Sequence, residues 1–419
     1  MCRFCVYNHQ FVVAGNRIIT RKFIVLKFTD GRLQFTNYHK YIKSTHKVKD
    51  LADDGNNRFH FVAQLLNYCH FELGVKKFDL VTVSDIQSFL QAYGMCELPW
   101  DSEDCHRSLD TIKRCVRVIF DFISAYVDDK NNHSIIRKGN LYKMVDRRTT
   151  TGRVVQIKEP VFEVYYKKTG NTPLLRDIPN KAFLMLLNHI TVHHTDILGI
   201  TANCAFAGLR GAEGCNVRRS DSPLGPGVVI HTVDGEVVRI EIDLREELCL
   251  RSDMVSVGRI KKERIQRVPD IFLDAYVTCM KIYMDYMKGR KYEVQYGPLT
   301  VNSQGMAMTY ATFRQRFHTV VNEMIPIYLA DTDPEIVQYG RILQDCSLSP
   351  HVLRHWFTVQ LVLSGVAEPG TLAYWRGDKS VTSALTYLAD KGELNRKYSK
   401  VNNEMFSYLE WAAMKKQTF

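Results

Sequence analysis

Residues 349–356 have the sequence SPHVLRHW and mark the start of a helix near the C-terminal end of the chain. A serine followed by a proline is typical of a helix start, because the hydroxyl can cap free amide groups and proline fits the first turn. Apolar residues then recur at steps of four, three and four, at Val352, Trp356, Val359 and Leu363. This spacing predicts an amphipathic helix that ends near Gly365.

The first turn of this helix carries His351 and Arg354, which are three residues apart and therefore neighbours on one side of it. An arginine and a histidine at a helix N-terminus are typical of an anion site. Further along, residues 377–380 read GDKS, and Tyr387 follows. If folding brings this tyrosine to the anion site, its hydroxyl can attack a phosphate.

The composition indicates a globular protein with an anionic partner. The chain has 419 residues, 45% hydrophobic and 24% charged, which is enough for two or three domains. Its net charge is +11, and residues 1–50 carry ten Lys or Arg against two acids. Residues 130–158 carry eight Lys or Arg against one acid, a cluster that suits a phosphate backbone. The DNA-binding candidates are Arg137, Lys138, Lys143, Arg147, Arg148 and Arg153.

Several classes of protein are disfavoured. Eleven cysteines without a repeated spacing indicate reduced thiols rather than a disulfide framework. Cys2, Cys5 and His9 resemble half a zinc site, but no second pair follows at a suitable spacing, so we expect no metal and no cofactor. Because no stretch has the length of a membrane span and the N-terminus lacks a signal-peptide core, we expect no membrane association. The expected location is cytoplasmic, either nucleoid-associated in a bacterium or nuclear in a eukaryote.

The pattern of apolar and turn residues divides the chain into four parts. Residues 1–45 predict a basic β-hairpin, which either packs on the next domain or serves as a DNA-binding arm. Residues 46–150 predict a helical domain, and the turn-rich residues 151–172 predict a linker. Residues 173–419 predict a larger domain of helices with one β-hairpin. The predicted fold class is α+β, mostly α with a small antiparallel β-sheet.

Four short motifs follow one another in the last of these parts. They are a Leu-Arg-x-x-Glu pattern, a lysine before a Val-Pro pair, a His-x-x-Arg pair and a tyrosine, carried by Arg210, Lys261, His351, Arg354 and Tyr387. Each motif alone is common on protein surfaces or in cores. Together, over residues 173–410, they resemble the catalytic domain of the tyrosine recombinases, also called phage-type integrases.

The resemblance implies that these five residues are catalytic, with Lys262 as the close competitor of Lys261. It implies a core-binding domain ahead of the catalytic domain, and residues 46–150 match one in size, position and helicity. The implied activity is DNA integration, excision or transposition of a mobile element, in which double-stranded DNA is cut at specific core sites and rejoined through a 3′-phosphotyrosyl link without ATP. The implied assembly is a homotetramer on two DNA sites. A C-terminal helix over residues 402–415 either docks on a neighbouring subunit or covers its own core.

The residue types suit this chemistry without the resemblance. Displacement at a phosphodiester builds negative charge on the equatorial oxygens, which two planar guanidinium groups can bind bidentately. His351 can take the proton of the tyrosine hydroxyl. A lysine on a mobile hairpin can supply a proton to the departing 5′-oxygen.

One position departs from the family pattern, which has a histidine or tryptophan nine residues before the tyrosine. Here this position is Asp378, whose ionised carboxylate cannot donate a hydrogen bond and would repel a phosphate. Asp378 can instead cap the helix that carries Tyr387, with Ser380 as the rival cap. Residues that can support the site or replace the missing donor are Glu213, His355, Trp375, Arg376 and Lys379.

Three functions stay open at this point. The five intact positions favour an active recombinase with a substituted contact. Asp378 leaves room for a DNA-binding regulator of the same fold that has lost cleavage. A type IB topoisomerase uses a similar set of residues but relaxes DNA without choosing sites.

Overall fold

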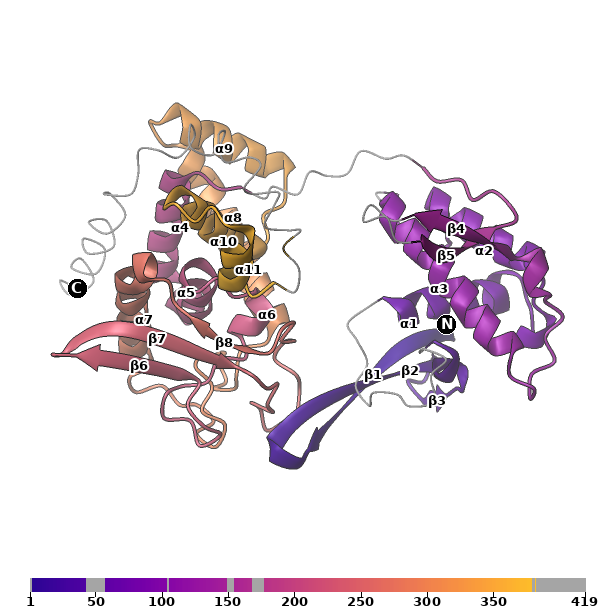
Figure 1. The fold of residues 1–419 in the computed structure, drawn as a ribbon, viewed down its shortest axis with the longest axis horizontal. Coiled ribbons are helices and arrows are strands. Elements are labelled where there is room, and N and C mark those ends of the chain that lie inside the picture. Colours follow the sequence, from indigo (N-terminus) through magenta and orange to yellow (C-terminus); the bar gives the residue numbers. More distant parts are fainter. Residues whose placement is uncertain are drawn as a thin grey trace. The chain divides into compact units, whose positions relative to one another are not determined.

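The chain forms two compact units, each with its own hydrophobic core. The first contains Met1–Phe11 and Ile19–Asn171, and the second contains Val12–Ile18 and Thr172–Phe419 (Figure 1). The computed structural model describes residues 2–42, 57–103, 105–148, 154–167, 177–378 and 381. Tyr387, Lys379, Arg153 and the predicted C-terminal helix lie outside the described residues.

The first unit contains three α-helices in its described part: α1 (Arg58–Asn67), α2 (Val83–Met95) and α3 (Leu109–Val127). Their apolar faces are buried against one another, as the helical spacing of Leu, Ile and Phe predicts. α2 begins at a capping box, in which Thr82 Oγ1 accepts from the amide of Asp85 (3.2 Å) and the amide of Thr82 donates to Asp85 Oδ2 (2.8 Å).

Two antiparallel sheets complete the first unit, one with the order β1-β2-β3 and the other pairing β4 with β5. The strands are β1 (Arg3–Val13), β2 (Arg17–Lys27), β3 (Leu33–Phe35), β4 (Tyr142–Arg148) and β5 (Val154–Pro160). The sequence predicts the β2–β3 hairpin but not β1, whose polar residues interrupt the apolar alternation. β5 lies within residues 151–172, so part of the stretch expected as a linker is a strand.

The second unit consists of helices and a three-stranded antiparallel sheet with the order β6-β7-β8, which lies at one edge of the helices (Figure 1). The strands are β6 (Val228–Val233), β7 (Glu236–Leu244) and β8 (Arg264–Arg267). The α-helices of the described part are α4 (Asn180–His193), α5 (Leu198–Phe206), α6 (Gly211–Gly214), α7 (Leu273–Met287), α8 (Tyr310–Leu329), α9 (Pro334–Asp345), α10 (His351–Leu363) and α11 (Pro369–Arg376). Within this described part, no helix has the length and apolar character needed to cross a bilayer. The mostly helical α+β prediction is confirmed.

The core of this unit lies between α4, α5 and α10. All nine residues of α5 are buried, and α10 packs directly on that helix. Trp356 of α10 stacks on Phe183 of α4, with ring centroids 3.8 Å apart and an interplanar angle of 15°. Its indole nitrogen donates to Asn180 Oδ1 (2.7 Å), so this buried polar atom is satisfied.

α10 begins at His351, as the SPHVLRHW stretch predicts, but the hydroxyl of Ser349 does not cap it. Pro350 stands at the N-cap position, and no side chain caps the helix there. The amide of Val352 instead donates to the main-chain carbonyl of Ser349 (3.0 Å). The start of this helix is therefore held by a backbone turn.

Gly208 allows α10 to approach the chain segment that leads to Arg210. Its φ is +66°, and a Cβ at this position would lie 2.4 Å from the ring of Phe357. Only glycine meets both conditions, the left-handed backbone and the close approach. As a result, the first turns of α10 lie against the segment that carries Arg210, although the two are far apart in the sequence.

Candidate active site

Four segments of the second unit bring charged side chains to one place. Arg210 stands at the N-cap of α6, and Arg354 lies in the first turn of α10. Arg376 and Asp378 lie at the C-terminal end of α11, and Lys262 lies in the bend before β8. We call Arg210, Arg354, Arg376 and Asp378 the arginine cluster.

One carboxylate oxygen joins the first two arginines of this cluster. Asp378 Oδ1 accepts from Arg210 Nη2 at 2.6 Å and from Arg354 Nη2 at 2.8 Å. These three residues are separated by up to 168 positions in the sequence. Two guanidinium groups therefore converge on a single anionic oxygen, which is the arrangement that two-arginine recognition of an oxyanion requires.

The second oxygen of Asp378 is held by Arg376. Arg376 Nε donates to Asp378 Oδ2 at 2.6 Å, and its Nη1 donates to Thr358 Oγ1 at 2.7 Å. Burial by itself would raise the pKa of the Asp378 carboxyl, but the hydrogen bond from Arg376 and the charges of Arg354 and Arg376 hold it below its usual value. Asp378 is therefore ionised, and both of its oxygens accept hydrogen bonds from arginines.

Glu213 orients Arg210 through two hydrogen bonds. This fully buried carboxylate accepts from Arg210 Nη1 (2.9 Å) and from the amide of Arg210 (3.1 Å). Arg264 of β8 donates to it as well, from Nη2 at 2.9 Å. Burial raises the pKa of Glu213, but the hydrogen bond and charge of Arg264, together with Arg210, bring it below its usual value. The sequence places Glu213 in the motif with Arg210, but no sequence signal points to Arg264.

Arg354 is buried with one donor left over. Only 1% of its side chain is exposed, and its Nη1 donates to the carbonyl of Gly208. Among the described residues, no group accepts from its Nε. Burial, followed by the charges of Arg210 and Arg376, lowers the pKa of Arg354 to about 9. The cluster thus holds a buried cation whose positive charge is only partly compensated, and an additional anion would stabilise it.

His351 stands at the exposed start of α10, close to three positive charges. Although its side chain reaches solvent, the surrounding protein and then the charges of Arg354, Arg376 and Arg210 lower its pKa to about 4. At neutral pH His351 is therefore uncharged, and it can accept a proton.

The structure brings Lys262 rather than Lys261 into contact with the cluster. Lys262 Nζ donates to the carbonyl of Asp378 at 3.1 Å. The side chain of Lys261 is exposed, and its amide lies 3.3 Å from Glu213 Oε1. Both residues precede β8, so neither is part of a strand. This contact favours Lys262 as the candidate, and the choice between the two lysines stays a prediction.

Gly377 leaves space for the side chain of Arg264 next to the arginine cluster. It ends α11 in the left-handed conformation (φ +57°), and a Cβ there would lie 2.3 Å from Arg264 Nε. A side chain at this position would displace Arg264 from Glu213. Glycine therefore allows Arg264 to pack beneath Asp378 and the turn that carries it.

Of the remaining predicted residues, those that the structure describes lie outside the arginine cluster. Trp375 contributes its main-chain carbonyl, which accepts a hydrogen bond from Gln266 Nε2 at 3.0 Å. His355 Nε2 lies 3.9 Å from Asp177 Oδ1. In the first unit, Lys143 and Arg147 both pair with Glu159, and Lys138 pairs with Asp128. Arg137 and Arg148 are exposed. The acids lie just outside the basic stretch, so the DNA-binding candidates are less positive as a surface than their sequence implies.

No protein-family model and no curated protein matches this sequence. Among solved structures, the chain is similar to the Tn1549 transposon integrase in complex with transposon right end DNA, with 18% identity, a TM-score of 0.46, and coverage of 86% of this chain and 97% of that one. It is also similar to XerH site-specific recombinase bound to difH substrate (14% identity, TM-score 0.45, covering 79% and 74%). A third is XerA recombinase (15% identity, TM-score 0.33, covering 81% and 89%). These neighbours are named as an integrase and as recombinases.

The depressed pKa of His351 can be measured directly. We expect its ring signals in a proton NMR titration to shift with a midpoint of about 4, because protonation adds a cation beside three arginines. The His351→Gln variant assigns the signals. The unfolded chain takes up this proton near the usual imidazole pKa of about 6.5, whereas the folded protein does so only near pH 4. The folded protein therefore loses stability as the pH falls from about 6.5 to about 4, because protonation of His351 favours the unfolded chain. A titration midpoint in the usual imidazole range would contradict this electrostatic account.

Proposed function

We propose that the chain is a site-specific DNA recombinase or integrase that cuts and rejoins DNA through a 3′-phosphotyrosyl intermediate. The observation that carries the proposal is the convergence of Arg210 and Arg354 on one oxygen of Asp378, at 2.6 and 2.8 Å. An arginine pair that already donates hydrogen bonds to one anionic oxygen is suited to stabilise the negative charge that develops on a phosphodiester during nucleophilic attack. The order of the motifs along the chain supports the same reading.

Each residue has a defined part in the proposed reaction. The hydroxyl oxygen of Tyr387 attacks the scissile phosphorus, and neutral His351 accepts the hydroxyl proton. The bond from phosphorus to the 5′-oxygen breaks, and Lys262 donates a proton to that oxygen. Arg210 and Arg354 stabilise the negative charge on the non-bridging oxygens throughout. Attack by a second 5′-hydroxyl on the phosphotyrosine reverses these steps, so no ATP is needed.

Asp378 is the residue that distinguishes this site from the family pattern. In the protein without DNA, its two oxygens take donors from all three arginines of the cluster. A phosphate that binds Arg210 and Arg354 must therefore compete with the carboxylate or share the guanidinium groups with it. This competition keeps the arginines in position before DNA arrives, and it also weakens their hold on DNA.

The same residue favours a second candidate function, a DNA-binding regulator that does not cut. If the carboxylate keeps its place when DNA binds and does not share the guanidinium groups, the arginine pair cannot bind the phosphate. The basic surface would still bind the DNA backbone. Cleavage activity separates the two functions.

The proposed partner is double-stranded DNA with specific core sites, bound by a homotetramer on two sites. The net charge of +11 supports an anionic partner. Exposed basic residues of the first unit, Arg137 and Arg148 among them, are proposed to contact the DNA backbone.

The nucleophile can be tested with a suicide substrate, a nicked duplex made from the inverted repeats in the DNA that flanks the gene. The wild type should form a covalent protein–DNA adduct, which runs as a slower band in a denaturing gel. Tyr387→Phe should abolish the adduct and leave DNA binding intact, because only the hydroxyl is removed.

Tyr374→Phe is the matched control, since this tyrosine is 60% exposed on α11 and should not be needed. An adduct with Tyr387→Phe would exclude Tyr387 as the nucleophile. A wild type that binds the repeats without forming an adduct would point to the regulator. Relaxation of supercoiled plasmids that lack the repeats would indicate a topoisomerase.

The choice between Lys262 and Lys261 can be tested by replacing each with alanine. Lys262→Ala should slow cleavage of the suicide substrate, and Lys261→Ala should not, because only Lys262 Nζ reaches the cluster. A substrate with sulfur in place of the 5′-oxygen needs no proton donor, so it should restore cleavage by Lys262→Ala. Slow cleavage by Lys261→Ala that sulfur rescues would assign the acid to Lys261 instead.

Asp378→Asn should tighten DNA binding. The amide keeps an oxygen that can accept from the arginines but removes the negative charge that competes with phosphate. We expect a higher affinity at low salt and a slope of log K against log salt that steepens by up to about one. Asp221→Asn, which removes a charge paired with Arg219 at the surface of the same unit, is the control and should change binding much less. Equal or weaker binding by Asp378→Asn would show that the carboxylate does not compete with DNA.

A further inference from the structure

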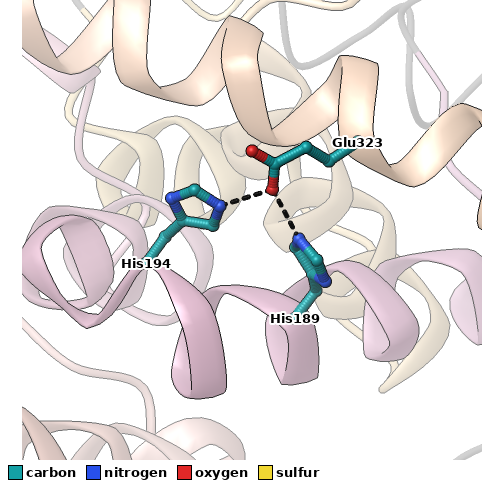
Figure 2. A group of neighbouring side chains, drawn as sticks. All are labelled: His189, His194 and Glu323. Atoms are coloured by element: carbon teal, nitrogen blue, oxygen red, sulfur yellow. Dashed lines mark hydrogen bonds and ion pairs between the residues drawn. The ribbon is translucent and has the colours of Figure 1, made fainter.

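A second cluster of side chains lies between α4 and α8, two helices that pack on each other. His189 is on α4, His194 follows its last residue, and Glu323 is on α8. Figure 2 shows both imidazole rings pointing toward the Glu323 carboxylate. We call these three residues the His–Glu cluster. It shares no residue with the arginine cluster.

The geometry of this cluster is convergent. Glu323 Oε2 lies 2.8 Å from His189 Nε2 and 2.6 Å from His194 Nε2. All three ligand atoms lie within 4.8 Å of one another. The side chains of the two histidines are mostly buried, with 15% and 9% exposed, whereas that of Glu323 is 42% exposed. The cluster is thus held by the protein on one side and open to water on the other.

Two imidazole nitrogens and one carboxylate oxygen form a ligand set typical of zinc sites with an open position. Around a tetrahedral Zn²⁺ with bonds of about 2.0–2.1 Å, neighbouring ligand atoms are about 3.3 Å apart. The carboxylate oxygen, now 2.8 and 2.6 Å from the two nitrogens, would therefore move about 0.5–0.7 Å away from each of them. The two nitrogens lie within 4.8 Å of each other and would approach by up to about 1.5 Å. We propose that His189, His194 and Glu323 bind a divalent transition-metal ion, with Zn²⁺ as the best fit and water as the fourth ligand.

Metal binding at the His–Glu cluster requires the proton on each histidine Nε2 to move. Arg316 Nη2 lies 3.3 Å from His194 Nδ1 and can only donate, so the ring proton of His194 sits on Nε2 in the metal-free protein. When a metal binds both Nε2 atoms, each ring proton moves to Nδ1 through water, and the 3.3 Å contact breaks.

Arg316 can give up this contact without leaving its place. It is held separately by Asp196, through Nε to Oδ2 at 3.0 Å and Nη2 to Oδ1 at 3.1 Å. Arg316 therefore opposes metal binding by favouring the wrong tautomer of His194. Replacing it with glutamine, whose carbonyl oxygen can accept the Nδ1 proton, should strengthen binding, since a hydrogen-bond acceptor behind a metal-binding histidine orients the ring and raises its basicity.

The test uses the full-length protein, stripped with a chelator and kept under a thiol reductant. Calorimetric titration with Zn²⁺ should show one site per chain that His189→Gln, His194→Gln and Glu323→Gln each weaken by at least roughly tenfold, because a ligand is lost. Arg316→Gln should bind Zn²⁺ more tightly than the wild type. His231→Gln is the matched control, since His231 also pairs with a glutamate, Glu241 at 3.4 Å, but has no second histidine in that pair.

Two further measurements keep the proposal falsifiable if a variant is less stable. Zn²⁺ should raise the melting temperature of the wild type but not of Glu323→Gln, whose side chain is largely at the surface. Co²⁺ should give visible bands of a nitrogen and oxygen site, without sulfur charge-transfer bands. Zn²⁺ affinity that the three glutamine variants leave unchanged, Co²⁺ bands from thiolates, or no Zn²⁺ binding by the wild type would each overturn it. None of these readouts depends on DNA cleavage.

Discussion

The carboxylate of Asp378 is the interaction on which the candidate active site depends. Three guanidinium groups cannot lie together in a mostly buried place unless an anion holds them, and Asp378 supplies hydrogen-bond acceptors to all three. Removing one partner from such a buried charged group costs about 3–5 kcal/mol. The residue that looks like a defect in the sequence motif is therefore what organises the arginines in the protein without DNA.

The rest of the second unit serves to place those charges. Packing of α10 on the buried helix α5 fixes Arg354, and Gly208 and Gly377 allow backbone and side chains to approach where a Cβ would clash. Glu213 and Arg264 then hold Arg210 in one orientation. The site is positioned by apolar packing at long range and by carboxylates at short range.

Local sequence patterns were enough to predict several elements of the second unit and one ion pair of the candidate site. The helical spacing after His351 predicts α10, and an Asp-Gly turn predicts the β6–β7 hairpin. The Leu-Arg-x-x-Glu pattern pairs Arg210 with Glu213 correctly, because residues three apart at a helix start lie within reach of each other. The sequence could not choose between Lys261 and Lys262, of which only Lys262 has its side-chain nitrogen at the cluster. A bend in the backbone decides which of two adjacent lysines faces the site, and that bend depends on what packs around it.

The sequence by itself determined the kinds of chemistry available to this protein: two arginines, a histidine and lysines in an order that suits phosphoryl transfer. It also determined where helices begin and which faces are apolar, because these follow from spacing along the chain. Only the tertiary structure decided that Asp378 binds the arginines, that Arg264 supports Glu213, and that His189, His194 and Glu323 meet. Such contacts join residues that are far apart in the sequence, so they exist only once the helices have packed and brought the charges within a few ångströms of one another.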